Sequence, residues 1–117
     1  MIINLDYQSR TPIYEQIVLE IERYVALGIL KPEEQIPPIR EMATELGINP
    51  NTVKKAYSIL ESKGVIVTIS TKGTYIAYDT KSIIEEKVSS KFKELELIIG
   101  ELEKLGISKE EIINKMK

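Results

Sequence analysis

Residues 37–64 read PPIREMATELGINPNTVKKAYSILESKG and hold two short helical patterns separated by a glycine. Apolar residues recur at helical spacing in the first pattern, which predicts a helix over 38–46 that ends at Gly47. Asn49 suits an N-cap and Pro50 a first helical position, so a second helix follows almost at once. Two helices joined by so short a link predict a helix-turn-helix.

The second of these helices is predicted to close at Gly64 and to carry a polar stripe opposite its apolar one. If Val53, Tyr57 and Leu60 face the core, the residues that face solvent are Asn51, Lys55, Ser58 and Ser62, with Thr52 and Lys54 beside them near the helix start. A helix that reads DNA contacts base edges mainly through its N-terminal residues, and Asn and Lys side chains can pair with bases or phosphates. The alternative is an ordinary solvated face with two lysines.

Two β-type runs follow, VIVTI at 65–69 and TYIAY at 74–78, with a turn between them. A hairpin directly after a helix-turn-helix is typical of a winged-helix domain, which favours the DNA-reading interpretation of the preceding helix. The candidate contacts at the hairpin tip are Lys72, Gly73 and Thr74. Glycine allows close approach of the backbone, and amines and hydroxyls can bond phosphate oxygens. A plain hairpin turn is the alternative.

The segment before the helix-turn-helix is predicted to form an amphipathic helix over 12–28 and a turn over 31–35. Arg40 is the charged residue near the start of the helix 38–46, from which it could reach a base edge or a phosphate. From composition alone, an ion pair with Glu41 or Glu45 explains this arginine better.

Beyond Lys81, glutamate and lysine dominate and apolar residues alternate steps of four and three. This seam consists of Val88, Phe92, Leu95, Ile99 and Leu102. After Gly106, the pattern Ser108–Glu111 is a capping box that opens a last short helix. We expect the seam to hold two copies of the chain together, because an isolated two-helix tail would leave apolar surface exposed. The alternative is that it packs on the chain's own last helix and wing domain.

These patterns predict an α+β, mainly helical protein with a winged helix-turn-helix DNA-binding domain over 1–79 and a helical dimerisation region over 80–117. The 117 residues allow one small domain and an appendage. The 38 residues after position 79 are too few for an independent effector pocket. A small-molecule effector would need a pocket between subunits or between tail and wing domain, and the sequence shows none.

Charge is distributed unevenly along the chain. The total of 16 basic and 18 acidic residues gives a net charge of −2, which by itself predicts no partner. Residues 50–76, however, hold four lysines (54, 55, 63 and 72) against Glu61 alone, a local charge of +3. An acidic protein can still bind phosphates through a locally positive face.

The residue types that are missing exclude whole classes of function. With Cys 0 and His 0, the chain has no disulfide, no thiolate or imidazole metal ligand and no cysteine nucleophile. No Gly cluster for phosphates and no usefully spaced carboxylates are present, so we expect neither an enzyme, nor a metal, nor a cofactor. No leader-like start and no apolar run of the roughly 20 residues that a membrane span needs is visible, so we expect a cytoplasmic protein without a membrane partner.

Several motifs in fixed order resemble the GntR family of bacterial transcriptional regulators, and its YtrA-like subfamily in particular. They are residues 11–17 (TPIYEQI), 28–47 (GILKPEEQIPPIREMATELG), 48–57 (INPNTVKKAY) and 72–75 (KGTY). The resemblance is close over residues 1–78. It implies a homodimeric winged-helix repressor that binds a palindromic operator. It also implies that Arg40 reads a base, that Asn51, Thr52 and Lys55 belong to the recognition helix, and that Gly73 lies in the wing.

The sequence departs from the family pattern at two places. Pro38 stands where the family usually has serine, so a phosphate contact from a hydroxyl or N–H is not expected there. The wing carries Thr68–Thr71 where relatives are often richer in arginine, which predicts weaker nonspecific binding or a larger share of the binding energy from the helix. The alternative function is a winged-helix module that binds a protein through the same surface and does not bind DNA.

Overall fold

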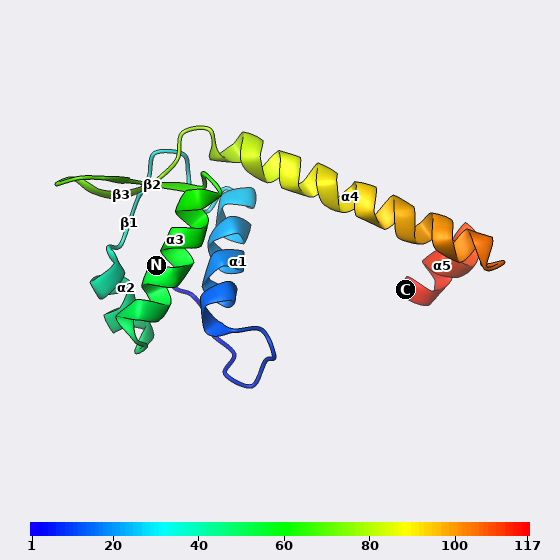
Figure 1. Ribbon diagram of the computed structural model, residues 1–117, viewed down its shortest axis with the longest axis horizontal. Coiled ribbons are helices and arrows are strands. Elements are labelled where there is room, and N and C mark those ends of the chain that lie inside the picture. Colours follow the sequence, from blue (N-terminus) through cyan, green and yellow to red (C-terminus); the bar gives the residue numbers. More distant parts are fainter. The chain divides into compact units, whose positions relative to one another are not determined.

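A computed structural model describes residues 1–117, which divide into two compact units, Met1–Ile84 and Glu85–Lys117. The elements, labelled in Figure 1, are α1 (Ile13–Ala26), β1 (Gln35–Ile36), α2 (Ile39–Leu46), α3 (Pro50–Ser62), β2 (Ile66–Ile69), β3 (Gly73–Ile76), α4 (Thr80–Lys104) and α5 (Lys109–Met116). The predicted fold class, a mainly helical winged helix-turn-helix, is confirmed. None of the helices combines the length and the apolar character that crossing a membrane requires.

The core of the first unit lies where α1 and α2 pack against α3, with the small sheet beside them (Figure 1). Its fully buried side chains come from every one of these elements and include Ile17, Ile21, Met42, Val53, Leu60 and Ile76. The predicted apolar stripe of the helix 50–62 is therefore confirmed as its inward face. Because that stripe is covered, the opposite face of α3 is fixed toward solvent.

The link between α2 and α3 follows from two local conformations. Gly47 ends α2 with φ of 66°, in the left-handed region that favours glycine. The side chain of Asn49 then caps α3 by accepting a hydrogen bond from the backbone N–H of Asn51 at 2.8 Å. The start of α2 differs from the prediction by one residue. Pro38 has an extended backbone and precedes the helix, which begins at Ile39.

A partly buried hydrogen bond joins α3 to the segment that leads into α2. The hydroxyl of Tyr57 donates to the backbone carbonyl of Pro37 at 2.6 Å, and the Tyr57 side chain is buried. Burial raises the pKa of Tyr57, and the carboxylates of Glu45 and Glu41 raise it further. The phenol therefore keeps its proton and remains a donor through the neutral pH range.

The sheet has three strands in the order β1-β3-β2, and both pairings are antiparallel. The predicted hairpin is confirmed as β2 and β3, with Ile66 opposite Ile76 and Ile69 opposite Gly73. The first strand was not predicted. The turn expected over 31–35 ends one residue early, because Gln35 joins Ile36 in β1 and pairs with Tyr75. As a result β3 is the central strand and not an edge.

The second unit contains the rest of α4 and all of α5. Ser108 caps α5 in the predicted capping box with Glu111. The predicted helical region begins at residue 80, which is also the start of α4, but the first compact unit extends to Ile84. The physical reason is that Ile84 belongs to the core of the first unit and Thr80 is fully buried.

We predict that Tyr57→Phe lowers the free energy of unfolding by about 1 kcal/mol, because the Pro37 carbonyl loses its partner inside the protein. Urea and thermal unfolding at a fixed protein concentration measure the change. Tyr78→Phe is the matched control, since Tyr78 is 77% exposed and should leave stability unchanged. Equal stabilities of Tyr57→Phe and the parent would contradict the role given to this bond.

The raised pKa of Tyr57 predicts a pH dependence with a definite sign. Above the ordinary tyrosine pKa of about 10, the unfolded state loses the phenolic proton while the folded state keeps it. The contribution of Tyr57 to the free energy of unfolding is therefore fully present below about pH 10 and is lost as the pH rises above that value. We expect the stability difference between the parent and Tyr57→Phe to shrink between about pH 10 and pH 11. A stability difference between the two proteins that stays constant over this pH range would contradict the raised pKa of Tyr57.

Candidate nucleic-acid interface

The exposed face of α3 carries most of the predicted DNA-contacting residues. Asn51, Lys54, Lys55 and Ser58 are exposed, and Thr52 is half-buried. They come from the first nine residues of α3, which spans Pro50–Ser62. This face presents two ammonium groups together with amide and hydroxyl groups, a set that can bond to both bases and phosphates.

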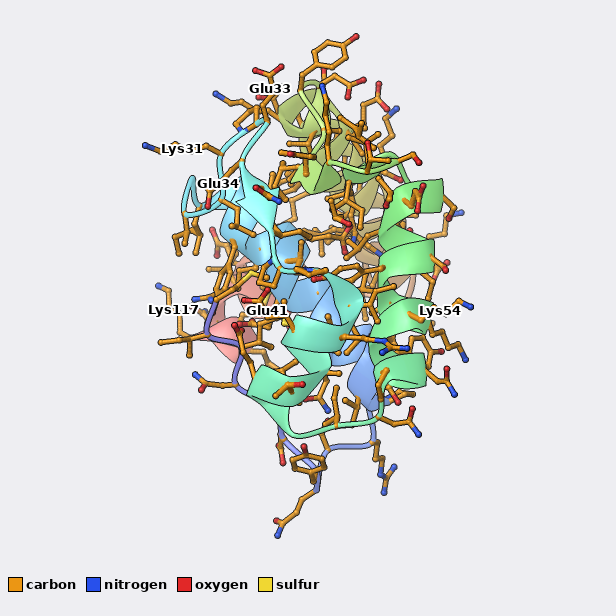
Figure 2. All side chains as sticks on the ribbon, turned by 90° about the vertical axis from the view of Figure 1, so that its left-hand side faces the viewer. Lys31, Glu33, Glu34, Glu41, Lys54 and Lys117 are labelled. Atoms are coloured by element: carbon orange, nitrogen blue, oxygen red, sulfur yellow. The ribbon has the colours of Figure 1, made fainter.

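The lysines of this face are not neutralised by carboxylates. Lys54 and Lys55 form no ion pair, whereas Lys63, at the end of the same helix, lies 3.9 Å from the buried Glu22. In Figure 2, Lys54 lies at one side of the first unit, and Glu33 and Glu34 lie at the opposite side. The two unpaired ammonium groups make this part of α3 locally cationic on a chain of net charge −2.

Arg40 lies in the first turn of α2 and is exposed. The ion pair with Glu41 or Glu45 that composition favoured is absent. The guanidinium therefore retains its donors for an outside acceptor, and a guanidinium can bond both to a guanine edge and to a phosphate.

The conformation of the backbone determines the shape of the wing tip, which is the turn between β2 and β3. Gly73 has a φ of 126°, and a Cβ at this position would lie 2.7 Å from the amide nitrogen of Gln35. The absence of that Cβ lets the Gln35 amide donate to the backbone carbonyl of Lys72 at 3.4 Å. The hydroxyl of Tyr75 donates to the same carbonyl at 3.1 Å. Side chains from β1 and β3 thus hold the backbone carbonyl of Lys72 in place, while the side chain of Lys72 stays exposed.

Thr74 does not lie on this surface. It was predicted as a wing-tip contact, but it is only 7% exposed. The reason is the alternation of side chains along β3, which places Thr74 on the same inward face as the buried Ile76. We therefore correct the candidate set by removing Thr74 and keeping Lys72 and Gly73 at the tip.

One contact to the α3 face was not foreseen from the sequence. The ammonium nitrogen of Lys55 lies 4.0 Å from the ring centroid of Tyr14, which belongs to the first turn of α1. This distance is within the range of a cation–π interaction.

The chain shows no candidate metal site, because no group of three or more carboxylate side chains is placed to hold a metal ion.

The second unit presents an apolar surface. Val88, Phe92 and Leu95 of the predicted seam are 48%, 61% and 39% exposed, and Ile99 and Leu102 are half-buried. A groove of about 480 Å³ runs between α4 and α5 and is lined mostly by apolar residues, among them Leu95, Ile99 and Leu102. No side chain from residue 85 to residue 117 is buried.

Comparison with known proteins agrees with this architecture. The family model described as "Bacterial regulatory proteins, gntR family" matches residues 13–76, which run from α1 to β3. The HTH-type transcriptional repressor YtrA of Bacillus subtilis is 39% identical over 111 residues, covering 94% of this chain and 85% of that protein.

Solved structures extend the likeness. The crystal structure of a transcriptional regulator from Oenococcus oeni has a TM-score of 0.77 and 38% identity, covering 96% of this chain and 93% of that one. The AraR DNA-binding domain in complex with operator ORR3 has a TM-score of 0.55 and 28% identity, covering 63% of this chain and 89% of that one. This chain therefore belongs to the GntR family of bacterial regulatory proteins, in its YtrA-like branch, and is a DNA-binding transcriptional regulator and not an enzyme.

Proposed function

We propose that the protein is a homodimeric repressor that binds a palindromic operator in the cytoplasm. Residues 1–79 form the DNA-binding domain and residues 80–117 the dimerisation region. The observation that carries the proposal is the exposed face of α3 with its unpaired lysines, together with an unpaired Arg40 on the neighbouring helix α2. The name of the similar Bacillus subtilis protein, a transcriptional repressor, supports the direction of regulation.

In this proposal α3 enters the major groove and the wing contacts the backbone. Asn51, Thr52 and Lys55 lie where a recognition helix meets base edges. Arg40 contributes a base contact from α2, and Lys54 and Lys72 neutralise phosphates. The similar AraR domain, whose crystal structure is in complex with operator ORR3, supports operator binding by this fold.

Dimerisation is supported by the exposure of the second unit. A two-helix segment that buries no side chain cannot hide its own apolar residues, and Phe92 remains 61% exposed. A second copy placed on the seam and on the groove between α4 and α5 removes this surface from water. A palindrome is then the natural target, because a two-fold dimer presents two recognition helices to half-sites about 34 Å apart.

We predict that Lys54→Ala and Arg40→Ala each weaken binding to the operator about tenfold or more, since each substitution is present twice in a dimer. Lys54→Ala should also make the affinity less dependent on salt. The slope of log K against log salt is negative, and its magnitude decreases by about 1 for each phosphate that is no longer neutralised. Fluorescence anisotropy over a range of salt concentrations measures both quantities on a duplex selected by the parent protein.

Lys31→Ala is the control for these variants, because Lys31 is also exposed and Figure 2 shows it on the opposite side of the first unit from Lys54. It changes the net charge equally and should leave the affinity nearly unchanged. Equal affinity of all three variants and the parent would contradict the assigned surface. Absence of any binding to duplex DNA by the folded parent at low salt would favour a protein-binding module instead.

We predict that Ile99→Asp converts the dimer to a monomer, because a carboxylate in the apolar seam must be desolvated on association. Sedimentation velocity at micromolar concentration measures the oligomeric state. Leu97→Asp is the matched control on the same helix, since Leu97 lies outside the seam and is 70% exposed. A parent protein that sediments as a monomer, or an Ile99→Asp variant that remains dimeric, would contradict the proposed interface.

A further inference from the structure

The contact between Lys55 and Tyr14 joins the recognition helix to a different helix of the same unit. Tyr14 is half-buried in the first turn of α1, and its ring lies under the ammonium group of the exposed Lys55, 4.0 Å from ring centroid to nitrogen. The packing of α1 against α3 keeps the two side chains near each other. This is the only cation–π pair in residues 1–117.

The chemistry of this contact differs from that of an ion pair. A carboxylate would hold the ammonium group but would also neutralise it and compete with DNA for it. The face of an aromatic ring attracts the cation through its quadrupole and adds no charge. Lys55 forms no ion pair, so it keeps its full charge while the ring restricts its flexible side chain.

We infer that Tyr14 is a positioning residue for DNA recognition, which holds the Lys55 ammonium group in place for an acceptor on a base edge. The inference rests on the proposed function, which assigns Lys55 to the recognition surface. Restricting the lysine before binding lowers the entropy lost on binding, and the effect is largest where geometry matters most. Tyr14 therefore contributes more to operator binding than to nonspecific binding, where a mobile lysine serves equally well.

The test is a double-mutant cycle on DNA affinity in the full chain. The probes are a duplex selected by the parent protein from a random pool and a scrambled duplex of the same length. Tyr14→Leu weakens operator binding roughly three- to tenfold and changes scrambled-duplex binding little, given the modest strength of exposed cation–π contacts and two copies per dimer. In the Lys55→Ala background, Tyr14→Leu has no further effect.

Tyr14→Phe is the conservative variant. It keeps the ring face and removes a hydroxyl that makes no hydrogen bond within the protein, so it retains the parent's affinity. Fluorinated phenylalanine at position 14 preserves the shape of the ring and withdraws charge from its face, so affinity falls with each added fluorine. This series keeps the test valid even where Tyr14→Leu perturbs folding, which a thermal melt of each variant reveals.

The possible outcomes distinguish a failure of the inference about Tyr14 from a failure of the proposed DNA-binding function. If Tyr14→Leu weakens binding equally with and without Lys55, the role of Tyr14 is structural and the inference is overturned, while the DNA-binding surface stands. If Lys55→Ala binds like the parent while Arg40→Ala does not, the inference is also overturned and only the assignment of Lys55 fails. A weakening that requires Lys55 and is graded with fluorination supports the inference.

Discussion

The hydroxyl of Tyr57 donates to the Pro37 carbonyl inside the protein, and this bond joins the middle of α3 to the segment from which α2 starts. Together with the left-handed turn at Gly47, it fixes one helix against the other. A recognition surface built from two helices depends on this rigidity, because every side chain that must be ordered on binding reduces affinity. The proposed role of Arg40 together with the lysines of α3 requires that α2 and α3 do not move independently.

The distribution of charge explains how an acidic chain belongs to a family of DNA-binding regulators. Lys54, Lys55 and Arg40 are left without carboxylates, while Lys63 at the end of α3 and Arg23 on α1 are paired. Leaving exposed cations unpaired costs little stability, since surface ion pairs contribute about 0–1 kcal/mol. The resulting attraction to phosphates is modest for a single copy. In the proposed dimer, two linked copies raise the affinity without any new contact, which connects the exposed seam of α4 to the same function.

The elements with strong periodicity or local signals could be predicted from the sequence. The N-cap at Asn49, the capping box at Ser108 and the polar face of α3 depend only on neighbours in the chain. The two-residue strand β1 could not, because it has no period and exists only through its pairing with β3. The error at Thr74 has a different origin, since its side chain shares the inward face of β3 with Ile76.

Long-range side-chain contacts were likewise beyond sequence reasoning. The Tyr57–Pro37 bond, the Gln35 contact at the wing tip and the Tyr14–Lys55 pair join residues from different elements. Tyrosines 14 and 57 carry no local pattern that separates them from tyrosines packed only for their apolar area. The exposed polar face of α3, the candidate site, was therefore predictable, whereas the contacts that fix its side chains follow from the tertiary structure.

The most direct test of two-fold DNA recognition is a hydroxyl-radical footprint of the purified protein on the DNA upstream of its own gene. Two identical subunits with one recognition helix each should protect two half-sites of an inverted repeat on one face of the duplex, with centres about 10 base pairs or a multiple of that apart. A single protected window without two-fold symmetry, produced by a protein that stays monomeric on the DNA, would contradict it.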